Sequence, residues 1–158
     1  MTSFRPARLA APLLLAAAVF ASTSVAQTAP PSKGEQALTY RKSLYQVIVW
    51  NFGPMSAMAQ GKVPYNAAEF AKRAERVAAV TPLLTEAYPP ESEGVKNSKL
   101  KPEMWSNRAD FDSKLKDLIE RSAALATVAK GGDFDKSKAA FFDTANACKA
   151  CHEKYKAD

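Results

Sequence analysis

The sequence has few of the residues on which several protein classes depend: its 158 residues include two cysteines, one histidine and six glycines. Two cysteines exclude a small scaffold held together by several disulfides. A single histidine excludes sites that need two imidazoles from one chain, such as bis-histidine haem, histidine-rich zinc sites and HExxH proteases. The composition also excludes a collagen-like or low-complexity chain.

Charge of one sign is not concentrated anywhere in the chain. Lysine and arginine number 22 and aspartate and glutamate 16, which gives a mild formal net charge of +6. Because there is no arginine-rich run and no interleaving of aromatic and basic residues, we do not expect a nucleic acid as partner. Hydrophobic residues make up 47% and charged residues 24%, so one globular domain with a core is expected.

Long hydrophobic runs are also absent, apart from one near the N-terminus. That region has a positive start, an apolar run broken once by proline, and a small-residue cleavage motif: Arg5 and Arg8, residues 9–20, and Ser24-Val25-Ala26. The apolar run of about 12 residues is shorter than the roughly 20 that span a bilayer. We therefore predict that residues 1–26 are a secretory signal cleaved after Ala26, that residues 27–158 form the mature domain, and that this domain is periplasmic.

Helical periodicity continues through the mature chain, and no stretch shows a convincing two-residue alternation. After a loose lead at residues 27–33, helices are expected at 35–59, after Asn66, from Ser106 or Asn107, and at about 134–155. A long connection with three prolines covers residues 89–102. The pattern predicts an all-α fold, an antiparallel four-helix bundle without membrane spans.

Capping residues and prolines mark the expected helix boundaries. Asn66 is a helix cap, and Glu69 three residues later is a candidate for the reciprocal bond. Asp133 is expected to cap the last helix. Pro54 is expected to kink the first helix without ending it, and Pro82 to kink or end the second.

The last helix carries a Cys-x-x-Cys-His motif at residues 148–152. Two thiols at this spacing can add to the two vinyl groups of one haem, and the following imidazole then becomes the axial iron ligand. On this helix one stripe is predicted to face the bundle core: Phe141, Ala145, Cys148, His152 and Tyr155. The motif therefore predicts one haem c per chain, bound covalently through Cys148 and Cys151, with His152 as metal ligand.

Three other interpretations of this motif are less favoured. A zinc site needs a fourth ligand, and no second cysteine-rich or histidine-bearing segment offers one. A redox-active dithiol is typically placed at a helix N-terminus, whereas these cysteines lie in the last two turns of theirs. A plain structural disulfide is the remaining alternative.

A Cys-x-x-Cys-His motif near the C-terminus of an exported four-helix chain resembles the cytochrome c′ family, the class II c-type cytochromes. Four weaker matches follow in the order of that family: Tyr40-Arg41, Phe52-Gly53, residues 61–65 and Pro102-Glu103-Met104-Trp105. The resemblance covers nearly all of the mature chain and implies the same bundle, with the haem near the C-terminal end of the fourth helix.

The resemblance also implies roles for single residues. Arg41 matches the arginine that meets a haem propionate, and Lys42 stands where the family often has a glutamine near the propionates. Tyr45 matches the position above the distal face of the iron. Lys156 stands where many members carry an arginine near the proximal pocket, and a lysine lacks the planar fork of that arginine.

The sixth iron ligand separates low-spin electron carriers from members with an open site. On one face of the first helix, Arg41, Tyr45, Ile48 and Phe52 fall within about 60°. Met55 is about 15 Å along the helix from Tyr45, too far to bind the same iron, whereas spacing does not exclude Met104. We expect five-coordinate, high-spin iron under an apolar distal pocket built by Tyr45, Ile48 and Phe52. For Tyr45, core packing and gating of the iron both stay open.

The favoured function is a redox-active haem protein that binds NO or CO, where NO handling is what the resemblance implies. The alternative is a low-spin electron-transfer cytochrome resembling cytochrome c556, which its positive charge would steer to acidic redox partners. An enzyme is not expected, because no carboxylate lies on the face from Arg41 to Phe52 to act as distal base. The resemblance implies a homodimer through the first two helices, and Trp50 points away from the core as a candidate interface residue.

Overall fold

The computed structural model describes residues 29–157, so the predicted signal segment and its cleavage site lie outside the described residues. Four long helices and three short elements make up this part of the chain: α1 (Lys33–Ala59), α2 (Ala67–Val80), η1 (Thr81–Glu86), η2 (Pro90–Ser92), α3 (Glu103–Ser106), α4 (Arg108–Ala129) and α5 (Phe134–Tyr155). Among these residues no helix combines the length and apolarity needed to cross a membrane.

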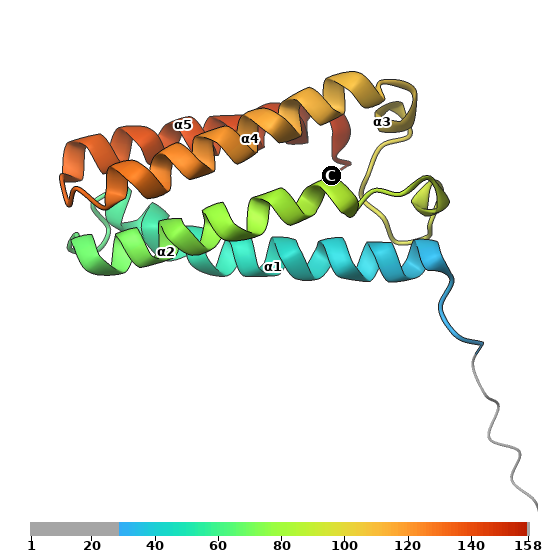
Figure 1. Ribbon diagram of the computed structural model, residues 1–158, viewed down its shortest axis with the longest axis horizontal. Coiled ribbons are helices and arrows are strands. Elements are labelled where there is room, and N and C mark those ends of the chain that lie inside the picture. Colours follow the sequence, from blue (N-terminus) through green and yellow to red (C-terminus); the bar gives the residue numbers. More distant parts are fainter. Residues whose placement is uncertain (1–28, 158) are drawn as a thin grey trace, which may run out of the picture.

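The long helices are arranged in two layers (Figure 1): α1 and α2 form one, and α4 and α5 the other. The start of α1 and the end of α5 lie at the same end of the molecule, beside the connection between α2 and α4. This connection covers residues 81–107, more than the predicted 89–102, and is called the long connection from here on. The predicted all-α, antiparallel four-helix bundle is confirmed. The connection adds the short helix α3 and two 3₁₀ segments that the periodicity did not reveal.

Most of the predicted boundary signals act as expected. The side chain of Asn66 accepts a hydrogen bond from the backbone N–H of Glu69 at 3.0 Å, and that of Asp133 accepts one from Lys136 at 3.0 Å. Glu69 was a candidate for the reciprocal bond but does not form it, because its carboxylate pairs with Arg73 at 2.7 Å instead.

The reciprocal cap occurs at the start of α1, where the sequence suggested a loose lead. Ser32 Oγ accepts a hydrogen bond from the N–H of Glu35 at 3.3 Å, and the Ser32 N–H donates to Glu35 Oε2 at 2.8 Å. Because this capping box satisfies free N–H groups of the first turn, α1 begins at Lys33 rather than at Glu35.

The two prolines lie at different places relative to their helices: Pro54 is inside α1, and Pro82 follows the end of α2. Pro54 lacks an N–H and therefore leaves the carbonyl of Trp50, four residues earlier, without its helical partner. Arg73 of α2 donates to that carbonyl through Nη1 at 3.2 Å, and α1 continues to Ala59. Pro82 lies in η1, where the second α-helix has already ended at Val80.

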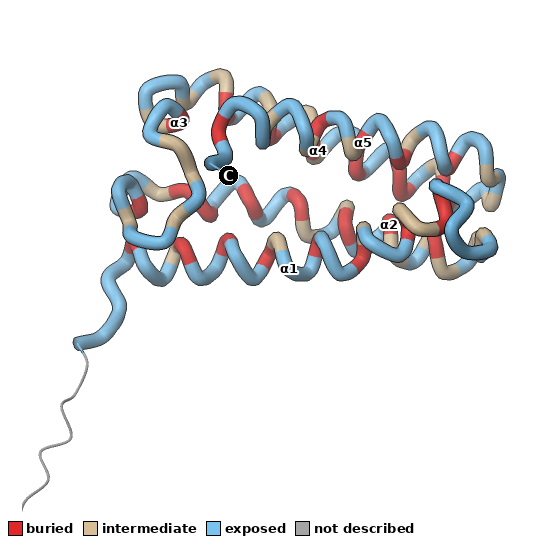
Figure 2. The backbone as a smooth tube through the Cα atoms, turned by 180° about the vertical axis from the view of Figure 1, so that it is seen from behind, coloured by how far each residue is buried: buried red, intermediate tan, exposed pale blue. Residues whose placement is uncertain are grey.

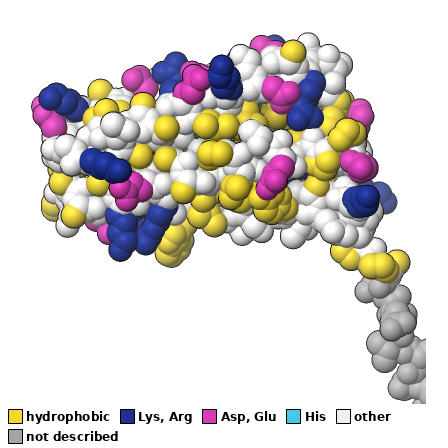
Figure 3. Space-filling view, in the orientation of Figure 1, with side chains coloured by type: hydrophobic (Ala, Val, Ile, Leu, Met, Phe, Trp, Pro, Cys, Tyr) yellow, Lys and Arg dark blue, Asp and Glu magenta, His cyan; other side chains and the backbone are white. Residues whose placement is uncertain are grey.

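Buried residues lie on the sides of the helices that face the other layer (Figure 2). In the space-filling view, hydrophobic side chains form a band along the middle of the bundle, and many charged ones lie near its edges (Figure 3). At the end of the bundle opposite the long connection, five aromatic residues pack together: Phe52, Tyr65, Phe70, Phe134 and Phe141. We call this group the closed end.

Candidate functional site

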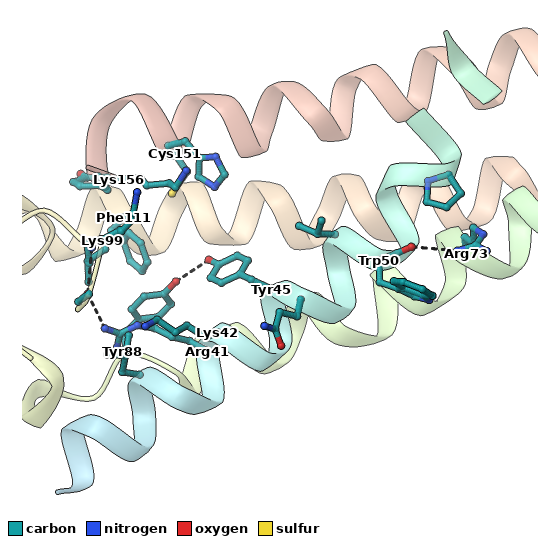
Figure 4. A pocket seen from close by; sticks show the side chains of 18 residues that line it. Arg41, Lys42, Tyr45, Trp50, Arg73, Tyr88, Lys99, Phe111, Cys151 and Lys156 are labelled. Atoms are coloured by element: carbon teal, nitrogen blue, oxygen red, sulfur yellow. Dashed lines mark hydrogen bonds between the residues drawn. The ribbon is translucent and has the colours of Figure 1, made fainter. Parts of the chain in front are cut away.

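A cavity of about 1000 Å³ lies near the opposite end, between α1, α5 and the long connection. We call this the cavity end. Its walls include three residues from α1 and three from α5: Leu38, Arg41 and Tyr45, and Cys151, His152 and Tyr155 (Figure 4). Its size is at the upper limit of typical pockets for small molecules and cofactors.

The end of the chain is fastened to the long connection beside this cavity. The N–H of Lys101 donates to the carbonyl of Tyr155 at 2.8 Å, and the N–H of Ala157 donates to the carbonyl of Lys99 at 2.8 Å. Lys99 and Lys156 both reach the cavity wall (Figure 4). Leu38 and Arg41 line the same cavity as His152, so the start of α1 lies at the level of that histidine.

The Cys-x-x-Cys-His motif lies at this wall, where its last two residues line the cavity. Cys148 and Cys151 are half-buried free thiols that pack against the core, and Cys151 and His152 line the cavity. His152 is exposed as a residue, because the cavity is open to solvent. Phe141 and Tyr155 on the same predicted stripe are buried, and His152 lies on the wall of the cavity in which a macrocycle could be buried.

The local environment favours the uncharged forms of all three motif side chains. Burial, with a smaller contribution from Cys151, raises the pKa of Cys148 to about 11. Burial also raises the pKa of Cys151 and lowers that of His152, which the charge of Lys156 lowers further. Neutral thiols do not suit a dithiol redox catalyst, and a neutral imidazole suits a metal ligand. The described part of the chain holds no cluster of three or more His, Cys, Asp or Glu able to bind a metal ion.

Arg41 is a buried cation whose recorded side-chain partners are neutral. It is 4% exposed, its Nη1 donates to Ser92 Oγ at 3.1 Å, and its Nη2 donates to Ser98 Oγ at 3.0 Å. Across residues 29–157 no carboxylate lies within ion-pair distance of it. Burial lowers its pKa, because a buried charge is costly without a counter-charge. The site therefore suits a ligand that brings a negative group to Arg41.

Three lysines add positive charge to the same walls: Lys42, Lys99 and Lys156. Much of the remaining lining is apolar or aromatic, including Leu38, Leu100 and Phe111. An apolar interior with cationic side chains fits a flat apolar macrocycle that carries carboxylates. The residues present therefore fit a haem, with Cys148, Cys151 and His152 beside the cavity that would hold it.

The predicted distal pocket is built differently from the expectation. Tyr45 is half-buried on the cavity wall, but neither Ile48 nor Phe52 belongs to that wall. Ile48 is buried in the core, and the ring of Phe52 stacks on Phe141 with centroids 4.3 Å apart. The reason is the face of α1 on which they lie: Pro54 is farther along α1 than Phe52 and still lines the cavity, together with Val49 and Trp50, whereas Ile48 and Phe52 pack into the core.

Two aromatic residues that the sequence did not assign to the site line the wall with Tyr45. Tyr88 comes from the long connection and Phe111 from α4, and their rings meet edge to face at 4.8 Å. The periodicity placed Phe111 in the core, and Tyr88 lies in a segment without periodicity, so neither carried a signal for this site.

The methionines lie away from the cavity. Met104, the open candidate for a sixth iron ligand, is fully buried in α3 and belongs to the hydrophobic core. Met55 is equally buried in α1. Neither is part of the cavity wall.

Comparisons with known proteins agree with the motif and the fold. A family model described as Cytochrome C′ matches residues 36–156. Cytochrome c′ from Alcaligenes xylosoxydans xylosoxydans is 34% identical over 125 residues, which cover 79% of this chain and 96% of that protein. The structure is also similar to cytochrome c prime from Shewanella frigidimarina, with a TM-score of 0.77 and 37% identity over 82% of this chain and 100% of that one.

A further solved structure that resembles this chain contains a small ligand. It is the nitric oxide complex of a variant of cytochrome c prime from Alcaligenes xylosoxidans. Its TM-score is 0.74 and its identity 33%, over 82% of this chain and 100% of that one.

Proposed function

The chain belongs to the cytochrome c′ family, and from this premise we propose that it is a periplasmic haem c protein whose five-coordinate, high-spin iron binds NO and CO and is redox-active. The observation that carries the proposal is the cavity that brings Tyr45 and the buried Arg41 opposite the Cys-x-x-Cys-His motif. The nitric oxide complex of the related protein supports NO as a ligand.

Each of these side chains has a defined task. Cys148 and Cys151 would hold the haem through thioether bonds, and His152 would be the protein ligand of the iron. Arg41 would pair with a propionate, with Lys42 beside it on the cavity wall. When bound, the haem supplies an iron that takes up diatomic gases and exchanges one electron.

Two observations support an open sixth position. Met55 and Met104 are buried outside the cavity. Burial and the neighbouring Tyr88 raise the pKa of Tyr45, so its phenol stays neutral and is a poor iron ligand.

We further propose a binding protein rather than an enzyme. Among the described residues that line the cavity there is no carboxylate and no histidine besides His152. A peroxidase needs a distal base to move a proton, and His152 is assigned to the iron. Peroxide turnover comparable to that of dedicated peroxidases would contradict this proposal.

We propose a homodimer through α1 and α2. Trp50 is 76% exposed and Val49 66% exposed on α1, and large exposed apolar side chains are typical of interfaces. Trp50→Lys is expected to convert the dimer to a monomer in sedimentation experiments at micromolar protein. A wild-type protein that is already monomeric at that concentration would contradict the dimer.

The decisive experiment is an absorption spectrum of the protein, produced in a host that attaches haem c and reduced with dithionite, before and after CO is added. A broad high-spin band that sharpens and shifts with CO is expected. A sharp low-spin band that ignores CO would reject the open site and favour the electron carrier. Absence of any haem band would reject the whole proposal. Replacement of both Cys148 and Cys151 by serine should make the haem extractable with acid and organic solvent.

A further inference from the structure

Tyr45 and Tyr88 form a pair of hydroxyl groups on the cavity wall. Their Oη atoms are 2.7 Å apart, and the two side chains point at each other from α1 and from the long connection (Figure 4). Both belong to the wall that also contains Cys151 and His152.

The two hydroxyl groups carry two hydrogens, and the hydrogen bond between them uses only one. Each phenol has one hydrogen to donate, and only one hydrogen can occupy the contact between the two oxygens. Among residues 29–157 neither hydroxyl has another recorded partner. One O–H group of the pair therefore remains available to an acceptor inside the cavity.

The surroundings of Tyr88 decide which hydroxyl keeps the free hydrogen. The guanidinium of Arg41 lies 5.3 Å from the centroid of the Tyr88 ring, and Arg108 Nη1 donates to the Tyr88 carbonyl at 2.9 Å. The 2.7 Å contact allows either oxygen to donate, and positive charge beside a phenol makes it a stronger donor, which favours Tyr88 as the donor to Tyr45. A hydroxyl that accepts a hydrogen bond becomes a better donor itself, which leaves a polarised O–H on Tyr45.

Both phenols keep their hydrogens at neutral pH. Burial is the largest cause that raises the pKa of Tyr45, and it also raises the pKa of Tyr88 despite the opposing charges of Arg41 and Arg108. Neither group is therefore a phenolate, and the pair acts as a donor.

We propose that Tyr45 donates a hydrogen bond to a diatomic ligand held in the cavity, and that Tyr88 is the positioning residue that orients and polarises this donor. The proposal rests on the proposed function, because the haem iron must hold the ligand in the same cavity. Tyr45 then acts on the ligand through its hydroxyl group as well as through the volume of its ring.

The test is the infrared C–O stretch of the reduced CO complex, recorded in H₂O and in D₂O, together with the CO dissociation rate. A hydrogen bond to the ligand lowers the stretching frequency and makes it sensitive to deuterium. Tyr45→Phe is expected to raise the frequency, abolish the deuterium shift and accelerate dissociation roughly three- to tenfold, the range for loss of one hydrogen bond. Tyr88→Phe should move the frequency in the same direction by a smaller amount, because Tyr45 keeps its hydroxyl.

The matched control is Tyr65→Phe, which removes a hydroxyl at the closed end that donates to Ser137 Oγ at 3.1 Å. It should leave the C–O stretch and the dissociation rate unchanged. If Tyr45→Phe alters only the rate of CO entry and not the stretch, Tyr45 acts by bulk alone and the donor proposal is rejected. If Tyr88→Phe behaves as the wild type, the positioning role is rejected. A wild-type protein with haem but no CO complex would reject the proposed open site itself, a result distinct from both.

Discussion

At the closed end, Phe52 of α1 stacks on Phe141 of α5 with ring centroids 4.3 Å apart, whereas at the cavity end the same two helices enclose a space of about 1000 Å³. Core packing holds the closed end together, where Phe70 and Phe141 are almost fully buried. Such packing fixes the distance between helices by contact of rings.

Hydrogen bonds from the long connection hold the cavity end instead. Ser92 and Ser98 accept from Arg41, and Lys99 and Lys101 bond the backbone at the end of α5. Side-chain packing therefore holds α1 and α5 close together at the closed end, and the long connection keeps them apart at the cavity end. Stability and ligand binding should then respond to different substitutions.

Phe141 at the closed end is expected to have the largest effect on stability, because it is only 2% exposed. Phe141→Ala removes a buried ring from the closed end and should lower the free energy of unfolding by about 3–5 kcal/mol. Urea denaturation of the haem-loaded protein measures this loss, and the CO spectrum should stay as in the wild type. The neighbouring Phe142, 39% exposed, is the control: its ring packs edge to face on Phe141 at 5.5 Å, so Phe142→Ala should cost about 1–2 kcal/mol, clearly less than Phe141→Ala. A changed CO spectrum in Phe141→Ala would show that the two ends are coupled.

Arg41 is expected to stabilise the cavity end mainly when haem is bound. Arg41→Met should lower the free energy of unfolding by about 2–3 kcal/mol in the haem-loaded protein, where a propionate would pair with the guanidinium. In the haem-free protein the loss should be smaller, because a buried cation without a counter-charge contributes little stability or even costs some. Denaturation of both forms measures the difference. Equal losses in the two forms would contradict a propionate partner for Arg41.

The sequence predicted the long helices and the Cys-x-x-Cys-His motif better than the rest of the cavity wall, for a physical reason. Phe141 and Leu118 recur at helical spacing, and helices that bury an apolar stripe must pack as a bundle. Cys148, Cys151 and His152 were found from their spacing alone, because thioether chemistry and axial ligation need consecutive positions on one chain. Regular structure and covalent chemistry are therefore readable along the sequence.

The rest of the site depends on residues that are distant in sequence. The partner of Tyr45 is Tyr88, and the partners of Arg41 include Ser98, 57 residues away. These partners come from a connection without periodicity, so their positions could not be predicted from the sequence. Phe52 was misplaced for a related reason: its spacing puts it on one helical face with Tyr45, but its ring packs on Phe141 in the core and not on the cavity wall.

The third prediction concerns the place where the connection meets the start of α1. A Cβ atom on Gly34 would lie 2.2 Å from the carbonyl oxygen of Glu91 and 2.7 Å from a methyl group of Val95. Gly34→Ala should therefore lower the free energy of unfolding by about 1–3 kcal/mol, against the usual gain of alanine in a helix.

The control for Gly34 is Gly53, also in α1, where an added Cβ meets no atom within 4 Å. Because Pro54 disfavours a side chain at the residue before it, the usual gain is partly cancelled, and Gly53→Ala should change stability by about 0.5 kcal/mol or less. Since Glu91 lies next to Ser92, Gly34→Ala should also disturb CO binding. Unchanged CO binding together with the stability loss would show that the connection can shift without moving Arg41.

Asp110, near the cavity end, is expected to make a small contribution to the pH dependence of stability. The hydroxyl of Tyr155 donates to its carboxylate, and Lys154 Nζ lies 3.0 Å away; these bonds, that of Tyr155 first, lower the pKa of Asp110 below its usual value of 3.8. A lowered folded-state pKa adds stability above the unfolded-state value, and this stability is lost as the pH falls through the folded-state value. The thermal midpoint of the wild type should therefore fall more steeply below about pH 4 than that of Asp110→Asn.

Asp143→Asn is the control for Asp110, because Asp143 is an exposed carboxylate on α5 for which the described residues show no hydrogen bond. Its acid profile should follow that of the wild type. The effect of Asp110 is expected to be small because the carboxylate is solvent-exposed and screened.

Tyr155 lines the cavity, and its backbone carbonyl accepts a hydrogen bond from the long connection, so acid should loosen the cavity end before the closed end. If the NMR signals of the closed-end rings Phe70 and Phe141 instead disappear together with the haem signals in acid, the bundle unfolds as one unit, and the two ends differ in packing but not in cooperativity.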